Sequence, residues 1–142
     1  YPPISITFMP DEAKNGIEFR LRRKLIELGA NENTASVLLC LHHHGASTSK
    51  DLQNHCHIRQ PDVSMAISEL REMNLVHFAP KSESSRGRPA HIYRLRMSLE
   101  QSIQPFVNLA KKRAKEIVDD IESVRELVSS LEPKQKNAFT AV

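Results

Sequence analysis

The sequence predicts a mainly α-helical fold that contains one small β-hairpin and ends in a long helix. Three observations predict it. Aromatic residues make up only 5% of the 142 residues, tryptophan is absent and there are four glycines, a composition that argues against a sheet-rich sandwich or barrel. Apolar residues recur at helical spacing over most of the chain. That period breaks between residues 75 and 95, where two short runs of β-forming residues occur.

Two helices are predicted before residue 46. An N-terminal arm, residues 1–11, carries three prolines and no period, and a helix is expected to follow from about residue 12 to 28. Its apolar residues recur every three or four positions at Ile17, Leu21, Leu25 and Leu28. Gly29 then suits a left-handed cap. Asn31 is expected to cap the next helix, which Gly45 closes and whose inner face carries Ala35, Leu38, Leu39 and Leu41.

Residues 47–74 contain two short amphipathic segments joined by a tight turn. Thr48 or Ser47 suits the N-cap of a helix over residues 49–56 that ends near His57. A second helix begins at Gln60-Pro61, because proline is well accommodated in the first turn of a helix. Its predicted buried stripe consists of Val63, Ala66, Ile67 and Leu70. Two short helices across such a turn form a helix-turn-helix, whose second helix is available to enter a groove of DNA.

The two β-forming runs are LVHFAP (residues 75–80) and AHIYRL (residues 90–95). Between them lies KSESSRGRP, which is polar and free of apolar residues, so the segment predicts a hairpin with a long tip. A helix-turn-helix followed by such a hairpin is a winged helix. The predicted winged-helix domain covers residues 12–97.

The remainder of the chain predicts one long helix over residues 98–132, followed by a flexible tail, residues 133–142. Pro105 near its start predicts either a kink there or a beginning nearer Ser102. Nine apolar residues follow one another in steps of four and three, the spacing of a coiled coil. We therefore expect a homodimer formed through this helix, the alternative being a single helix that packs back on its own domain. The predicted dimerisation residues are Ile103, Val107, Ala110, Ala114, Ile117, Ile121, Val124, Val128 and Leu131.

The segment LGANENTASVLLCLHHHGASTSKDLQNHCHIRQPDVSMAISELREMNLV (residues 28–76), with the wing RGRPAHIYRL, resembles winged-helix transcription regulators of the TrmB and MarR kinds. The resemblance covers roughly residues 17–97. It implies a DNA-binding regulator of transcription from an archaeon or a bacterium, with dimerisation through the C-terminal helix. Two departures are visible: His57 stands where family members often carry glycine, and the second helix of the pair presents Ser64, Met65 and Ser68 instead of several basic residues.

Candidate DNA contacts lie on the second helix of the pair and on the wing. Hydroxyl and amide side chains can hydrogen-bond to base edges or phosphates, and Met65 can contact a thymine methyl group. Arg86 and Arg88, joined by Gly87, suit a narrow minor groove or the phosphates beside it. The alternatives are a solvated helix face and a flexible basic loop. The predicted DNA-binding residues are Thr48, Ser49, Arg59, Gln60, Pro61, Ser64, Met65, Ser68, Arg71, Lys81, Arg86, Gly87, Arg88 and Arg94.

Seven histidines and two cysteines raise a metal-sensing alternative, since Cys56 and His57 are donors that suit zinc. The sequence contains no CxxC pair, and three consecutive helical residues, His42 to His44, point about 100° apart and cannot share one ion. We therefore predict no metal site and no cofactor. Cys40 is interpreted as a small hydrophobic residue of a helix interior. Protonation-sensitive DNA binding through His55, His57 or His91 is left open.

The remaining predictions concern activity, partners and location. The sequence has no glycine-rich phosphate loop, no nucleophile elbow and no convincing pair of catalytic carboxylates, so no enzymatic activity and no catalytic residue are predicted. The net charge of +3 agrees with an anionic partner, and the expected partners are double-stranded DNA and a second copy of the chain, with an unidentified small-molecule effector left open. The rival is a winged-helix protein-interaction module that does not bind DNA. Without a membrane-spanning run, a signal peptide or a disulfide framework, a cytoplasmic location with no membrane partner is expected.

Overall fold

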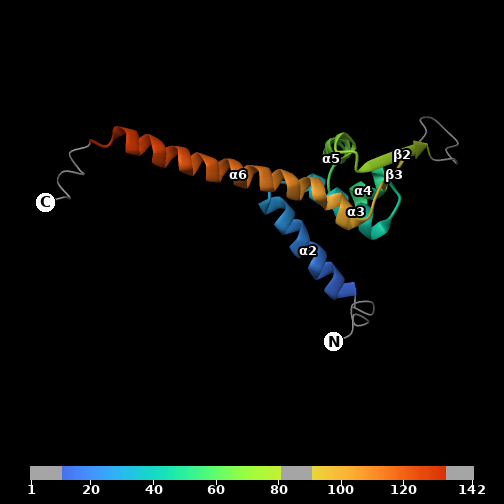
Figure 1. Ribbon diagram of the computed structural model, residues 1–142. Coiled ribbons are helices and arrows are strands. Elements are labelled where there is room, and N and C mark those ends of the chain that lie inside the picture. The colour runs from blue at the N-terminus through green and yellow to red at the C-terminus, as the bar shows by residue number, and fades with distance from the viewer. Residues whose placement is uncertain (1–10, 81–90, 134–142) are drawn as a thin grey trace. The chain divides into compact units, whose positions relative to one another are not determined.

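The computed structural model describes residues 11–80 and 91–133 (Figure 1). The chain divides into two compact units, Tyr1–Val107 and Asn108–Val142. The predicted fold class is confirmed: the structure is mainly helical, with a small antiparallel sheet and a long C-terminal helix. In chain order the elements are α2 (Asp11–Glu27), α3 (Glu32–His44), β1 (Ser47–Thr48), α4 (Ser49–Cys56), α5 (Gln60–Glu72), β2 (Val76–Pro80), β3 (His91–Leu95) and α6 (Leu99–Leu131).

The ends of α2 and α3 follow from their capping residues. After α2, the N–H groups of Gly29 and Ala30 donate to the carbonyls of Ile26 and Leu25, a Schellman arrangement that Gly29 permits with a φ of 112°. The Asn31 side chain accepts hydrogen bonds from the N–H groups of Asn33 and Thr34, as the sequence predicts for an N-cap. The connection between α2 and α3 is therefore held by the hydrogen bonds of Gly29, Ala30 and Asn31.

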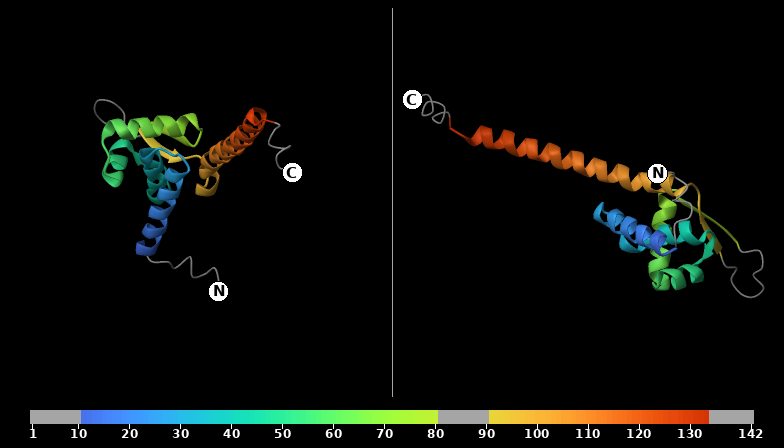
Figure 2. Two further views of the ribbon diagram at one scale, coloured as in Figure 1. Left: turned by 90° about the vertical axis from the view of Figure 1, so that its left-hand side faces the viewer. Right: turned by 90° about the horizontal axis from the view of Figure 1, so that it is seen from below.

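The core of the first unit is built around α3. Its buried residues pack with the inner stripes of α4 and α5, and Figure 2 shows these three helices gathered together, with the β2–β3 ribbon extending from them. The predicted inner face of α3 is confirmed. Only some of the apolar residues predicted to line the inner face of α2 are buried: Leu25 is buried, whereas Ile17 and Leu28 are 48% and 42% exposed. Leu28 lies beyond the last residue of α2, whereas Leu21 and Ile26 of the helix pack against the core.

The predicted hairpin is confirmed and is part of a three-stranded sheet with the order β1-β3-β2. In the antiparallel β2–β3 pair, Phe78 lies opposite Tyr93. On the other side of β3, Ser47 and Thr48 pair with Tyr93 and Ile92. The sequence did not predict this third strand, because two residues are too few to show an alternating pattern.

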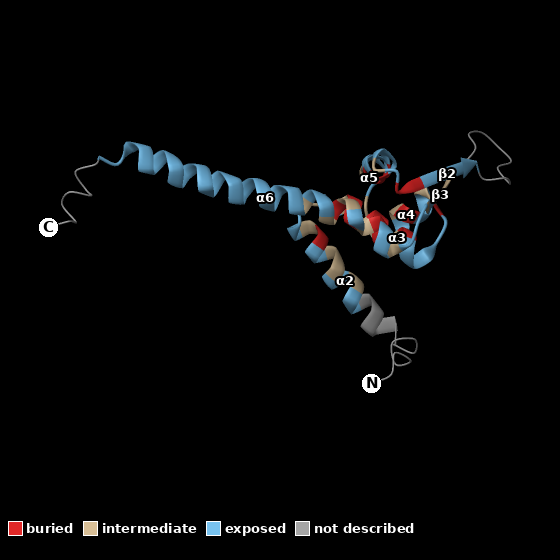
Figure 3. Ribbon diagram, in the orientation of Figure 1, coloured by how far each residue is buried: buried red, intermediate tan, exposed pale blue. Residues whose placement is uncertain are grey.

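Helix α6 begins at Leu99, so the alternative beginning nearer Ser102 is wrong. The Ser98 hydroxyl accepts a hydrogen bond from the N–H of Gln101 and stabilises the first turn. Pro105 lies inside the helix, where it removes a single N–H donor from the ladder. Within the first unit, Phe106 is buried in the core and Ile103 packs against it. In the second unit, residues 111–131 are all exposed (Figure 3).

Candidate nucleic-acid interface

A capping box starts the helix-turn-helix. The Thr48 hydroxyl accepts a hydrogen bond from the N–H of Asp51 at 3.1 Å, and the Asp51 carboxylate accepts one from the N–H of Thr48 at 3.0 Å. Because each residue satisfies a free donor of the other, α4 begins at a fixed residue. At the other end of α4, His57 takes the left-handed conformation, with φ 57° and ψ 41°. The turn that glycine would allow is therefore made by histidine, a side chain that is among those enriched at positive φ.

Helix α5 has one buried and one exposed face. The predicted buried stripe is confirmed: Val63, Ala66, Ile67 and Leu70 are all at most 5% exposed. The side of α5 that carries most of the predicted DNA-binding residues is open, and Met65 is 70% exposed. The exposed predicted residues of α5 and of the residue before it are Arg59, Gln60, Pro61, Ser64, Met65, Ser68 and Arg71. These seven residues form the α5 outer face.

Some side chains of the α5 outer face are held by neighbours. The Gln60 amide donates a hydrogen bond to the Ser64 hydroxyl at 2.9 Å, so these two polar groups are positioned together. The Arg71 guanidinium lies 4.0 Å from the centre of the Phe78 ring on β2, a cation–π contact. The positive charge of Arg71 is thus held at the junction of α5 and the hairpin.

The hairpin carries an aromatic cluster that the sequence analysis did not identify. The rings of Phe78 and His91 lie edge to face with centres 4.9 Å apart, and Tyr93 lies near both. The signal in the sequence is the presence of these rings in the two β-forming runs: Phe78 in the first, and His91 and Tyr93 two positions apart in the second. Arg94, a predicted DNA contact, is exposed on β3. The other predicted wing residues, Lys81, Arg86, Gly87 and Arg88, lie outside the described residues.

The remaining predicted DNA contacts are Thr48 and Ser49, at the start of α4. Thr48 is the cap already described, and the Ser49 hydroxyl accepts a hydrogen bond from the Gln53 amide at 3.4 Å. Both residues are half-buried, and both hydroxyls take part in the local structure of α4.

The predicted dimerisation residues divide between the two units. Ile103 and Val107 are half-buried in the first unit, where Ile103 packs against the core. In the second unit, five of the predicted residues, Ile117, Ile121, Val124, Val128 and Leu131, are 50–85% exposed. Val118 and Leu127, which the heptad spacing did not include, are 62% and 65% exposed and widen this apolar stripe. The stripe consists of Ile117, Val118, Ile121, Val124, Leu127, Val128 and Leu131.

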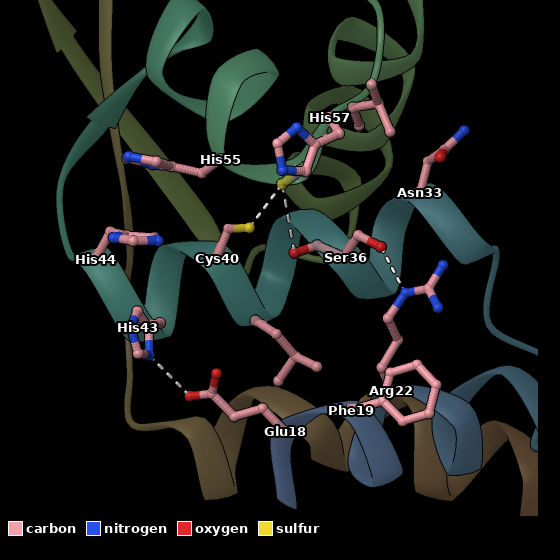
Figure 4. A pocket seen from close by; sticks show the side chains of 13 residues that line it. Glu18, Phe19, Arg22, Asn33, Ser36, Cys40, His43, His44, His55 and His57 are labelled. Atoms are coloured by element: carbon pink, nitrogen blue, oxygen red, sulfur yellow. Dashed lines mark hydrogen bonds and ion pairs between the residues drawn. The ribbon is translucent and has the colours of Figure 1, made fainter. Parts of the chain in front are cut away.

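Most of the histidines and both cysteines lie away from the α5 outer face, around a cavity of about 720 Å³ between α2, α3 and α4 (Figure 4). The rings of His44 and His55 stack with centres 3.7 Å apart. Partial desolvation, and then the neighbouring His55 and His43 rings, lower the pKa of His44. The His43 ring contacts the Glu18 carboxylate at 3.1 Å. Within residues 11–80 and 91–133, no group of three or more histidine, cysteine or acidic side chains is placed to hold a metal ion.

The Cys40 and Cys56 sulfur atoms lie 2.6 Å apart in this cavity. The sequence did not predict this pair, because a separation of 16 residues across two helices and a turn carries no spacing signal.

Among the described residues, none of the helices has the length and apolar character needed to cross a membrane.

The helix-turn-helix, the three-stranded sheet and the hairpin together define a winged helix-turn-helix domain. Residues 31–87 match the model of the MarR family, which confirms the predicted resemblance to winged-helix regulators of the MarR kind for this part of the chain. The crystal structure of NadR in complex with 4-hydroxyphenylacetate is similar, with a TM-score of 0.50 and 17% identity over 92% of this chain and 93% of that chain.

A second similar structure is MepR of S. aureus in a DNA-binding conformation, with a TM-score of 0.48 and 15% identity over 92% of this chain and all of the other. At 17% identity, the similarity to NadR supports the fold alone. No sequence among curated proteins matches the chain.

Proposed function

We propose that this chain is a transcription regulator of the MarR family that binds double-stranded DNA as a homodimer. The observation that carries the proposal is the α5 outer face, which lies opposite the buried stripe and follows a capped α4 and a left-handed turn. This is the element that a helix-turn-helix inserts into the major groove. The family match over residues 31–87 covers the same elements.

In this proposal the α5 outer face contacts bases and the flanking residues contact phosphates. Gln60, Ser64 and Ser68 supply donors and acceptors, and Met65 supplies an apolar contact. Arg59, Arg71 and Arg94 supply positive charge, with Thr48 and Ser49 at the start of α4 within the same interface. Lys81, Arg86, Gly87 and Arg88 act at the wing, on the minor groove or its phosphates.

The apolar stripe of the second unit supports the dimer. A helix that exposes seven large apolar side chains along more than four turns in water is typical of one that packs against a partner helix. Residues 12–97 then form the DNA-binding domain and residues 98–132 the dimerisation helix. A second copy of the chain spaces two α5 helices about one turn of DNA apart. A cytoplasmic location, the absence of enzymatic activity and an unidentified small-molecule effector belong to the same proposal.

Selection of bound duplexes from a random-sequence pool tests this function with the full chain. The expected result is an enriched inverted repeat whose half-sites have centres about 10 base pairs apart. The double variant Ser64→Ala/Ser68→Ala is expected to weaken or relax base preference within each half-site, whereas Ser130→Ala, on α6, is the matched control and should select the parent sequence. Recovery of the unselected pool by the folded parent protein would support the rival, an interaction module that does not bind DNA.

A further inference from the structure

The two cysteines of the chain form a close pair on different helices. Cys40 lies on α3 and Cys56 is the last residue of α4, and their sulfur atoms are 2.6 Å apart as free thiols (Figure 4). A disulfide bond is about 2.05 Å long, so the sulfur atoms need to approach by only about half an ångström to bond. Cys40 and Cys56 are the two cysteines of the sequence.

A small reagent has space beside this pair. Both cysteines are half-buried and both line the cavity of about 720 Å³, together with Phe19, Arg22 and His57. Thiol–disulfide exchange passes through a mixed disulfide, which requires room for the reagent next to the attacked sulfur. The cavity supplies that room.

The two thiols are not equivalent. Hydrogen bonding with Cys56 lowers the pKa of Cys40, against the opposing effects of burial and of the Glu18 carboxylate. The same hydrogen bond and burial raise the pKa of Cys56. The Cys56 thiol also faces the carbonyl of Ser36 at 3.7 Å, which favours its protonated form; because the thiolate is the nucleophile, we assign Cys40 as the attacking residue and Cys56 as the resolving one.

We propose that Cys40 and Cys56 form a reversible redox site that takes a low-molecular-weight disulfide as its substrate. The Cys40 thiolate attacks one sulfur of the substrate, a mixed disulfide forms, and the first thiolate leaves and takes up a proton. The Cys56 thiol then loses its proton and attacks the Cys40 sulfur, which releases the second thiolate. In sum, two protein thiols are oxidised to one intramolecular disulfide and the substrate is reduced to two thiols.

The bond would join the middle of α3 to the end of α4, one residue before the left-handed turn at His57. In the reduced protein the Cys56 thiol also faces the carbonyl of Ser36 at 3.7 Å, a contact that oxidation removes. The site thus lies between the first helix of the helix-turn-helix and the helix that supports it. This chemistry involves the thiols alone and does not require that the protein bind DNA.

The test equilibrates the full chain with reduced and oxidised glutathione at a series of ratios, native and in denaturant, and then measures intact mass and free thiols. The expected native product lacks two hydrogen atoms, has no free thiol and carries no glutathione. Because folding holds the sulfurs together, the native chain should be half oxidised in a glutathione mixture that is at least about tenfold more reducing than the mixture that half oxidises the denatured chain. Equal midpoints, a stable glutathione adduct or a disulfide between chains would overturn the proposal.

Single variants test the order of attack. In Cys56→Ser the reaction should stop at a glutathione adduct on Cys40, since the resolving thiol is gone. In Cys40→Ser the Cys56 thiol should react more slowly than Cys40 does in Cys56→Ser, because burial and the contact with the Ser36 carbonyl still favour the protonated form of Cys56. Thermal unfolding shows whether each variant is folded. Faster reaction at Cys56 in folded variants would contradict the assigned roles.

Discussion

The hydroxyl of Thr34 in α3 donates a hydrogen bond to a carboxylate oxygen of Glu69 in α5, with the two oxygens 2.9 Å apart. Thr34 is buried, whereas Glu69 lies on the exposed side of its helix. The apolar stripe of α5 turns one face of the helix toward the core, and this bond adds a directional contact between α5 and α3. A residue of α3 that lies outside the α5 outer face thus helps to hold α5 in place.

Replacing Thr34 by valine should lower the free energy of unfolding by about 1–2 kcal/mol, because a hydrogen bond to a charged acceptor is lost while the shape is kept. Thr34→Ser retains the hydroxyl and is the matched control. Urea denaturation of both variants measures the effect. Equal stability of Thr34→Val and the parent protein would show that the bond contributes nothing.

The left-handed turn at His57 predicts opposite effects for two substitutions. Valine is β-branched and disfavours positive φ, so His57→Val should lower the free energy of unfolding by about 1–2 kcal/mol. Glycine adopts this conformation without a steric penalty, so His57→Gly should equal or exceed the parent protein by up to about 1 kcal/mol. Thermal and urea denaturation would compare the two. A valine variant as stable as the glycine variant would contradict the left-handed conformation.

The stacked pair His44 and His55 predicts a pH effect. The pKa of His44 is lowered in the folded protein by desolvation and by the neighbouring His55 and His43 rings, and only Glu18 opposes them. The folded state therefore takes up this proton less readily than the unfolded chain. The stability from His44 is fully present above about pH 6.5, the value of an unperturbed histidine, and is lost as pH falls through the lower folded pKa.

Thermal unfolding between pH 7.5 and 5 tests this effect. His44→Asn should lose less stability on acidification than the parent protein, while His42→Asn, which leaves the stacked pair intact, should follow the parent. A parent-like pH dependence in His44→Asn would remove the proposed role of the stack.

The sequence predicted the elements whose signals are local. The caps at Asn31 and Thr48, the start of α5 at Gln60 and its buried stripe each depend on a few neighbouring residues, and the structure confirms them. Contacts between distant segments had no such signal. The Thr34–Glu69 bond, the Arg71–Phe78 contact, the Cys40–Cys56 pair and strand β1 all depend on how the helices and the hairpin pack together.

The apolar stripe of α6 predicts an association that one charge should disrupt. Ile121→Lys places an ammonium group within the stripe, and burying it unpaired would cost several kcal/mol. The dimer dissociation constant should rise at least about 100-fold. Ser123→Lys adds the same charge outside the stripe and should leave association near that of the parent. Sedimentation equilibrium measures both, and a parent protein that is monomeric at micromolar concentration would contradict the proposed dimer.

The most direct test of the proposed function is the affinity of the full chain for mixed duplex DNA as a function of salt concentration. Binding that neutralises phosphates predicts a steep fall of log K with log salt. Arg86→Ala/Arg88→Ala should reduce that slope by about two if each arginine contacts one phosphate. Lys111→Ala/Lys112→Ala on α6 removes the same charge and should keep the parent slope. A flat salt response of the folded parent protein would contradict DNA binding.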